Sequence, residues 1–79
     1  MTKEEFEKIN YLLKENLKYT SIIEALRHCR TNQIISRFSD GSIMNNHTLT
    51  ENETNSIIKI FEEAKALVVL KLKELGYDD

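Results

Sequence analysis

The chain of 79 residues has no proline, no tryptophan, only two glycines and a single cysteine. A chain without proline contains no residue that must interrupt a helix. The single Cys29 cannot form a disulfide within the chain, which fits a reducing compartment. The longest apolar run, residues 66–70, is far shorter than the roughly 20 residues of a membrane span. Because the charged start, residues 1–8, also differs from a secretory signal, we expect a cytoplasmic protein that does not contact membranes.

Features of enzymes and metal proteins are also scarce. The sequence has no phosphate-binding glycine pattern and no cluster of catalytic residue types. The soft or borderline metal ligands are His28, Cys29 and His47, and two adjacent residues point in different directions on a helix. A chain this short buries only about 60–65% of its unfolded surface, which leaves little room for a deep cleft. We therefore expect one domain, residues 1–79, with no enzyme activity, metal or cofactor.

The charged residues are unevenly distributed along the chain. The net charge is −2, but residues 18–38 carry +3, whereas residues 1–17 carry −1 and residues 39–79 carry −4. The basic residues of the middle segment are Lys18, Arg27, Arg30 and Arg37. This segment is the part of the chain best suited to contact phosphates.

Two helices are predicted in the first third of the chain. Thr2 and Glu5 form a capping box, and an apolar stripe follows at intervals of three and four residues, ending near residues 16–18. That stripe consists of Phe6, Ile9, Leu13 and Leu17, widened by Leu12. The stretch 19–21 interrupts the pattern. Ser21 and Glu24 then form a second capping box, which predicts a short helix over residues 22–28.

A third helix is predicted from Thr31 to Gly41. Thr31 can cap it, Ile35 and Phe38 can both face inward, and Gly41 can end it. Two alternatives remain open. Residues 21–38 can form one continuous helix, or residues 33–38 can form a strand that turns at Asp40 and Gly41 and returns through residues 42–47.

The longest helix is predicted to open at a capping box formed by Thr50 and Glu53 and to reach Leu75, before Gly76. It is apolar on more than one side, so one side can cover the other helices and a second side can pack against another chain. Homodimerisation through residues 50–75 follows, unless this helix is simply the central helix of a monomer. The expected interface residues are Ile57, Phe61, Leu67, Val68, Leu70 and Leu72.

The segment 21–41 resembles the helix-turn-helix of small phage and plasmid regulators, the lambda repressor and Cro-like group. The matching residues are Thr31, the run 35–38 (Ile-Ser-Arg-Phe) and Gly41, together with Ala25 at the small-residue position of the first helix. The resemblance implies that Asn32, Gln33, Ser36 and Arg37 face a major groove. It also implies that Arg30 and Thr31 approach the DNA backbone.

The expected fold is therefore all-α, a small four-helix domain with a helix-turn-helix-like pair and a long C-terminal helix. The expected function is a transcriptional regulator that binds a short palindromic DNA site as a dimer. The alternative is a small phage-type interaction or inhibitor protein that binds a host protein or sequesters a small ligand. In that case Glu62, Glu63 and the pair Asp78 and Asp79 would attract a basic partner.

Overall fold

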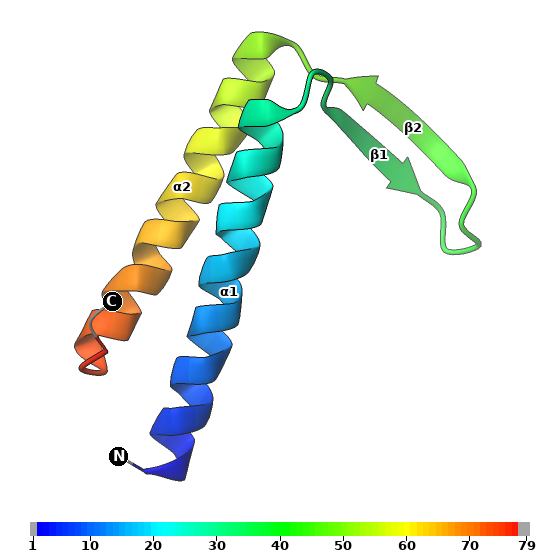
Figure 1. Cartoon of the computed structure of the whole chain (residues 1–79). Helices are drawn as coiled ribbons and strands as arrows, with labels where there is room; N and C mark the ends of the chain where they lie inside the picture. The colour runs from blue at the N-terminus through cyan, green and yellow to red at the C-terminus, as the bar shows by residue number, and fades with distance from the viewer. Residues whose placement is uncertain (1, 78–79) are drawn as a thin grey trace.

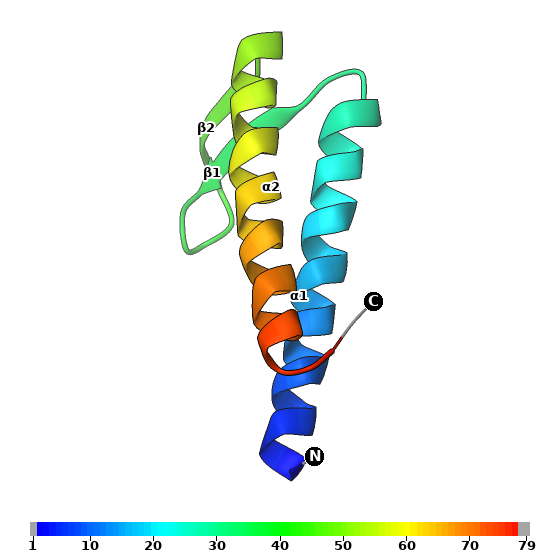
Figure 2. The same cartoon turned by 90° about the vertical axis from the view of Figure 1, so that its left-hand side faces the viewer.

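A computed structural model describes residues 2–77 and shows two long helices joined by a β-hairpin (Figure 1). The order is α1 (Lys3–His28), β1 (Gln33–Arg37), β2 (Ile43–Thr48) and α2 (Glu51–Glu74). The helices run antiparallel and side by side, and the hairpin projects from the end at which α1 stops and α2 starts (Figures 1 and 2). The fold is α+β, so the prediction of an all-α, four-helix domain is wrong.

Helix α1 begins where the sequence predicts but does not break at residues 19–21. Thr2 is the N-cap, and its hydroxyl oxygen accepts the N–H of Glu5 at 3.2 Å. At the expected break, the Thr20 hydroxyl donates to the Asn16 carbonyl at 2.9 Å, which satisfies this polar group inside the helix. The two short helices predicted for residues 2–28 are therefore one helix.

Helix α1 ends without a glycine. The C-cap Cys29 has an extended backbone, and its N–H donates to the Ala25 carbonyl at 2.9 Å. The side-chain Nδ2 of Asn32 donates to the Leu26 carbonyl at 3.0 Å and so satisfies one of the carbonyls left unpaired at the helix end. Asn32 thus has a structural role in ending α1.

Helix α2 confirms the prediction made from its ends. Both halves of the capping box are present: the Glu53 N–H donates to the Thr50 hydroxyl oxygen, and the Thr50 N–H donates to the Glu53 carboxylate. The helix stops at the C-cap Leu75. Gly76 follows with a φ of 82°, a left-handed conformation that glycine adopts without steric cost.

The core is a single seam between the two helices. Its positions recur alternately every three and four residues, the spacing of a coiled coil, and the rings of Tyr19 and Phe61 meet in it at 5.9 Å between centroids. The buried members are Ile9, Leu12 and Ile23 of α1 and Ile58, Val68 and Leu72 of α2. The predicted apolar stripe of α1 is only partly correct, because Phe6 and Leu17 are 58% and 68% exposed.

One polar side chain lies in this seam. Asn16 is half-buried, and its Oδ1 atom is fully covered yet accepts no hydrogen bond from any of residues 2–77. We predict that Asn16→Leu raises the free energy of unfolding by about 1 kcal/mol or more, since an unsatisfied buried polar atom costs about 1–3 kcal/mol. Urea unfolding followed by circular dichroism at a fixed protein concentration measures this gain.

The matched control is Asn10→Leu, which makes the same change at an exposed position of α1 and reports helix propensity alone. A gain at position 16 no larger than at position 10 would contradict the assignment of Asn16 to the seam.

Candidate functional site

The segment expected to be a recognition helix is the first strand of a β-hairpin. β1 and β2 pair antiparallel, from Gln33 opposite Thr48 to Arg37 opposite Ile43, and β2 carries one extra residue between the partners of Ser36 and Arg37. The prediction of a helix from Thr31 to Gly41 is wrong, and the alternative of a hairpin turning at Asp40 and Gly41 is confirmed. Adjacent β-branched residues, Ile34 and Ile35, favour a strand here.

The turn is held by its own hydrogen bonds. The Asp40 carboxylate accepts the Ser42 hydroxyl at 2.6 Å and the Ser42 N–H at 2.9 Å, and these two bonds lower the pKa of Asp40. Gly41 has a φ of 92°, which a side chain would strain. The Phe38 N–H donates to the Ser42 carbonyl at 2.8 Å and closes the turn. The tip of the hairpin is therefore well defined.

One face of the hairpin is turned toward α2 and the other is turned away from it. Ile34 and its partner His47 lie above the first turns of α2, where they share a hollow of about 360 Å³ with Glu53 and Ile57. Because side chains alternate along a strand, Gln33, Ile35 and Arg37 are on the opposite face, which is turned away from α2. The outward face also carries Asn46 and Thr48, the partners of Ile35 and Gln33.

The hairpin is exposed along its whole length. Every residue of β1 and β2 is exposed, and only Ile34 and His47 approach α2, at its first turns. An isolated two-stranded hairpin is only marginally stable in water. The large apolar side chains that it exposes are Ile34, Ile35, Phe38, Ile43 and Met44.

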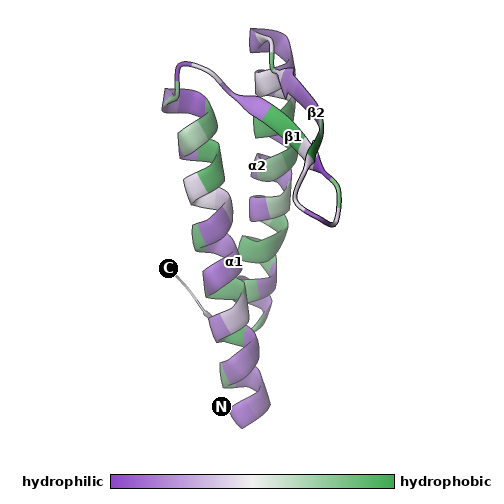
Figure 3. Cartoon of the chain, turned by 90° about the vertical axis from the view of Figure 1, so that its right-hand side faces the viewer, coloured by the Kyte–Doolittle hydropathy of each residue, from purple (hydrophilic) through white to green (hydrophobic). Residues whose placement is uncertain are grey.

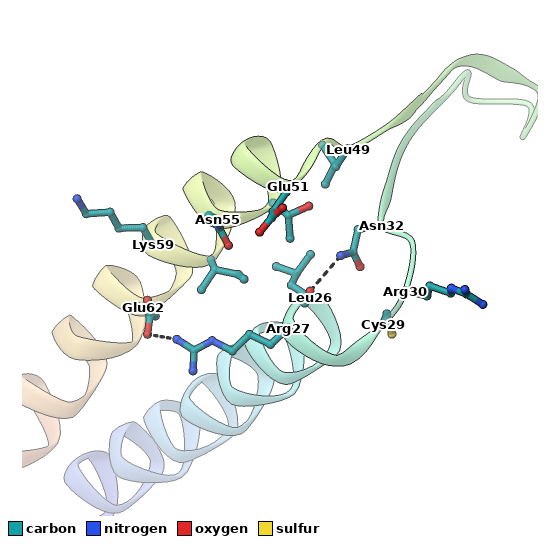
Figure 4. Close-up of a pocket in the computed structure, with 12 residues that line it drawn as sticks. Leu26, Arg27, Cys29, Arg30, Asn32, Leu49, Glu51, Asn55, Lys59 and Glu62 are labelled. Atoms are coloured by element: carbon teal, nitrogen blue, oxygen red, sulfur yellow. Dashed lines mark hydrogen bonds and ion pairs between the residues drawn. The ribbon is translucent and has the colours of Figure 1, made fainter.

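A groove of about 790 Å³ lies at the base of the hairpin, between the end of α1 and the start of α2 (Figure 4). Leu26 lines it at the end of the helix seam, and the Arg27 guanidinium donates to the Glu62 carboxylate across it at 2.6 Å. The other two cations, Arg30 and Lys59, extend away from one another in Figure 4. Because the groove pairs one cation with an acid and disperses the other two, it does not concentrate charge on a ligand.

The structure separates the residues expected to contact DNA. Arg30 and Thr31 lie in the connector after α1, and Asn32 is bonded to the end of that helix. Gln33 and Arg37 share the outward face of β1, and Nη1 of Arg37 donates to the Gly41 carbonyl at 2.9 Å. Ser36 is on the other face of β1.

The residues expected at a dimer interface also fall into three groups. Val68 and Leu72 are buried against α1, and Phe61 and Ile57 are half-buried, whereas Leu67 and Leu70 are 60% and 53% exposed. Glu62, expected to attract a basic partner, is paired with Arg27, and Asp78 and Asp79 lie outside the described residues. Within the chain as folded, Leu67 and Leu70 remain available to a second molecule.

Sequence reasoning named no residue of β2 as a site residue, so it missed Ile43, Met44 and the outward-facing Asn46. The Asp40-Gly41 turn indicates the hairpin as an alternative, and choosing that alternative brings these residues beside β1. Residues 2–77 contain no group of three potential metal ligands, and none of the described helices is long and apolar enough to cross a membrane.

No protein-family model, curated protein or solved structure matches this chain.

The contacts of Glu53, at the junction of β2 with α2, predict that the stability of the fold depends on pH. The Glu53 carboxylate accepts the Thr50 N–H at 2.9 Å and lies 3.0 Å from His47 Nε2, and these contacts, the backbone bond first, hold the pKa of Glu53 below its ordinary value of 4.5. A carboxyl group whose pKa is lowered on folding stabilises the fold above its ordinary pKa. That stability is lost as pH falls through the lowered value. We expect wild type to have a higher melting temperature than Glu53→Gln at pH 7, with the difference shrinking below pH 4.5.

Glu51→Gln is the control, because Glu51 lies in the same helical turn but takes no part in the capping box. An equal difference between wild type and Glu53→Gln at pH 7 and pH 3 would exclude this role of the Glu53 charge.

Proposed function

We propose that this chain is a small interaction protein whose working form is a homodimer. The observation that carries the proposal is its open shape. The Cα atoms have a radius of gyration of 16.2 Å, whereas a compact domain of this length has about 11.6 Å. Each helix or sheet of a stable domain must bury its apolar side against another element. A second chain would supply the surface that covers the apolar sides left open.

The surface area supports the same proposal. The chain exposes 6401 Å². A compact monomer of its 9.3 kDa mass exposes about 5,000 Å², so the excess is about 1,400 Å². A standard specific interface buries about 800 Å² on each partner, and obligate homodimers bury more. The excess is therefore of the size that a stable homodimer would remove from water.

Exposed apolar residues lie both on α2 and on the hairpin. Figure 3 shows apolar colour on the middle of β1 and along the part of α2 that lies behind the hairpin in that view. On the helices the large exposed apolar residues include Ile60, Leu67 and Leu70, and on the hairpin they include Ile34 and Ile35. A second copy that covers part of this apolar surface would remove it from water, as a domain core does.

The test is the mass of the protein in solution. We expect sedimentation equilibrium at micromolar concentration to give about twice the 9.3 kDa of one chain. The melting temperature should rise with protein concentration, because association stabilises the folded state by mass action. A particle of 9.3 kDa whose melting temperature does not depend on concentration would refute the homodimer.

A second candidate, DNA binding, is favoured by the outward face of the hairpin. No helix-turn-helix is present in residues 21–41, but a two-stranded β-ribbon also fits a major groove. The outward face carries Gln33, Arg37 and Asn46. These residue types suit base edges, since arginine pairs with guanine and asparagine or glutamine pairs with adenine.

Fluorescence anisotropy with duplexes from upstream of the gene, titrated across salt, tests this candidate. We expect sub-micromolar, salt-dependent and site-selective binding. Gln33→Ala and Arg37→Ala should remove the selectivity, whereas the control Ser36→Ala, on the other face of β1, should keep it. Binding no tighter than the roughly 10⁻⁴ to 10⁻⁶ M of non-specific contacts would reject DNA as the partner.

A further inference from the structure

The free edge of β1 is the strongest unassigned surface of the molecule. We propose that β1 of one copy pairs antiparallel with β1 of a second copy, with Ile35 directly opposite Ile35 of the second copy, so that the two hairpins form one four-stranded sheet. The proposal rests on the homodimer proposed above and says where its two chains meet.

The backbone of β1 has donors and acceptors that point outward. The Leu49 N–H donates to the Asn32 carbonyl at 2.8 Å, and the same register pairs Ile34 with His47 and Ser36 with Asn45. In an antiparallel ladder, hydrogen-bonded pairs alternate with pairs whose N–H and C=O groups point away from the partner strand. The backbone groups of Gln33, Ile35 and Arg37 are therefore free at the outer edge of β1.

The two edges of the hairpin are not equally suited to pairing. The extra residue of β2, close to Ile43, is a β-bulge, and a bulge increases the local twist and interrupts a regular ladder. β1 has no such irregularity over its own five residues. It also contains the β-branched pair Ile34 and Ile35 and carries a single charge, Arg37, at its end. Pairing between copies is therefore expected on β1.

The positions of the free backbone groups fix the register. An outward-pointing residue must face another outward-pointing residue for both of its bonds to form. With Ile35 opposite Ile35 of the second copy, Gln33 meets Arg37 of the second copy, and all three outward residues of each strand are used, giving about six hydrogen bonds. A shift that set Arg37 opposite Arg37 would pair fewer residues and place like charges together, which is unfavourable. The expected register is therefore symmetric about Ile35.

Pairing between the two copies of β1 would stabilise the hairpin. A sheet of three or more strands is stable where a two-stranded hairpin is marginal. The interface is of the isologous kind that a two-fold axis requires, because the same edge serves in both copies. Ile35, 44% exposed in one chain, would pack against its symmetry mate.

The test exploits the position of Ile35 on the two-fold axis. Ile35→Lys and Ile35→Glu each place like charges opposite one another, and we expect each variant alone to raise the dimer dissociation constant at least tenfold. An equimolar mixture of the two variants places Lys opposite Glu and should restore the dimer. Sedimentation equilibrium measures all three samples. Because Ile35 faces away from α2, the helical circular dichroism of both variants should match wild type.

The matched controls are Asn46→Lys and Asn46→Glu, which put the same charges on the same face but on β2, away from the axis. They should dimerise like wild type, singly and mixed. If wild type is a dimer and Ile35→Lys dimerises equally well, or if the Lys and Glu variants remain monomeric when mixed, the β1 pairing is refuted while the homodimer stands. A monomeric wild type would refute both.

Discussion

The seam between α1 and α2 is the contact on which the rest of the structure depends. All six buried apolar side chains of residues 2–77 belong to it, three from each helix. The antiparallel arrangement brings the end of α1 next to the start of α2, and the Arg27–Glu62 pair joins the last turn of α1 to the middle of α2 at 2.6 Å. An exposed ion pair contributes little to stability. The seam, and not this pair, therefore fixes the point from which the hairpin leaves.

Because the core is a seam between two helices, it buries only one side of α1 and one side of α2. The remaining sides of α1 and α2, together with both faces of the hairpin, form a flat molecule with a radius of gyration of 16.2 Å. A compact domain of this length has a radius of gyration of about 11.6 Å. Leu67 and Ile35 are both exposed, because no other element of residues 2–77 covers them. Apolar side chains such as these stay exposed in a single copy, and this exposure is the premise of the homodimer proposed above.

The helix ends that depend only on residues close in the sequence were predicted correctly. Thr2 and the pair Thr50 and Glu53 cap the helices as expected, because capping is settled within one helical turn. The break in α1 was predicted wrongly, since it depends on packing across the chain. The pattern of three and four residues continues through Tyr19 and Ile23, which pack against α2, and no signal within α1 itself shows that α2 lies opposite them.

The candidate site shows why residue type alone is insufficient. Read as a helix, residues 31–41 bury Ile35 and group Asn32, Gln33 and Arg37 on one side. Read as a strand, the repeat changes from 3.6 residues to two, so Ile35 joins Gln33 and Arg37 on an exposed face. In the first case the side chain of Ile35 packs within its own chain, whereas in the second it is exposed. The choice between helix and strand thus decides whether Ile35 is a core residue or a surface residue, and the turn at Asp40 and Gly41 favours the strand.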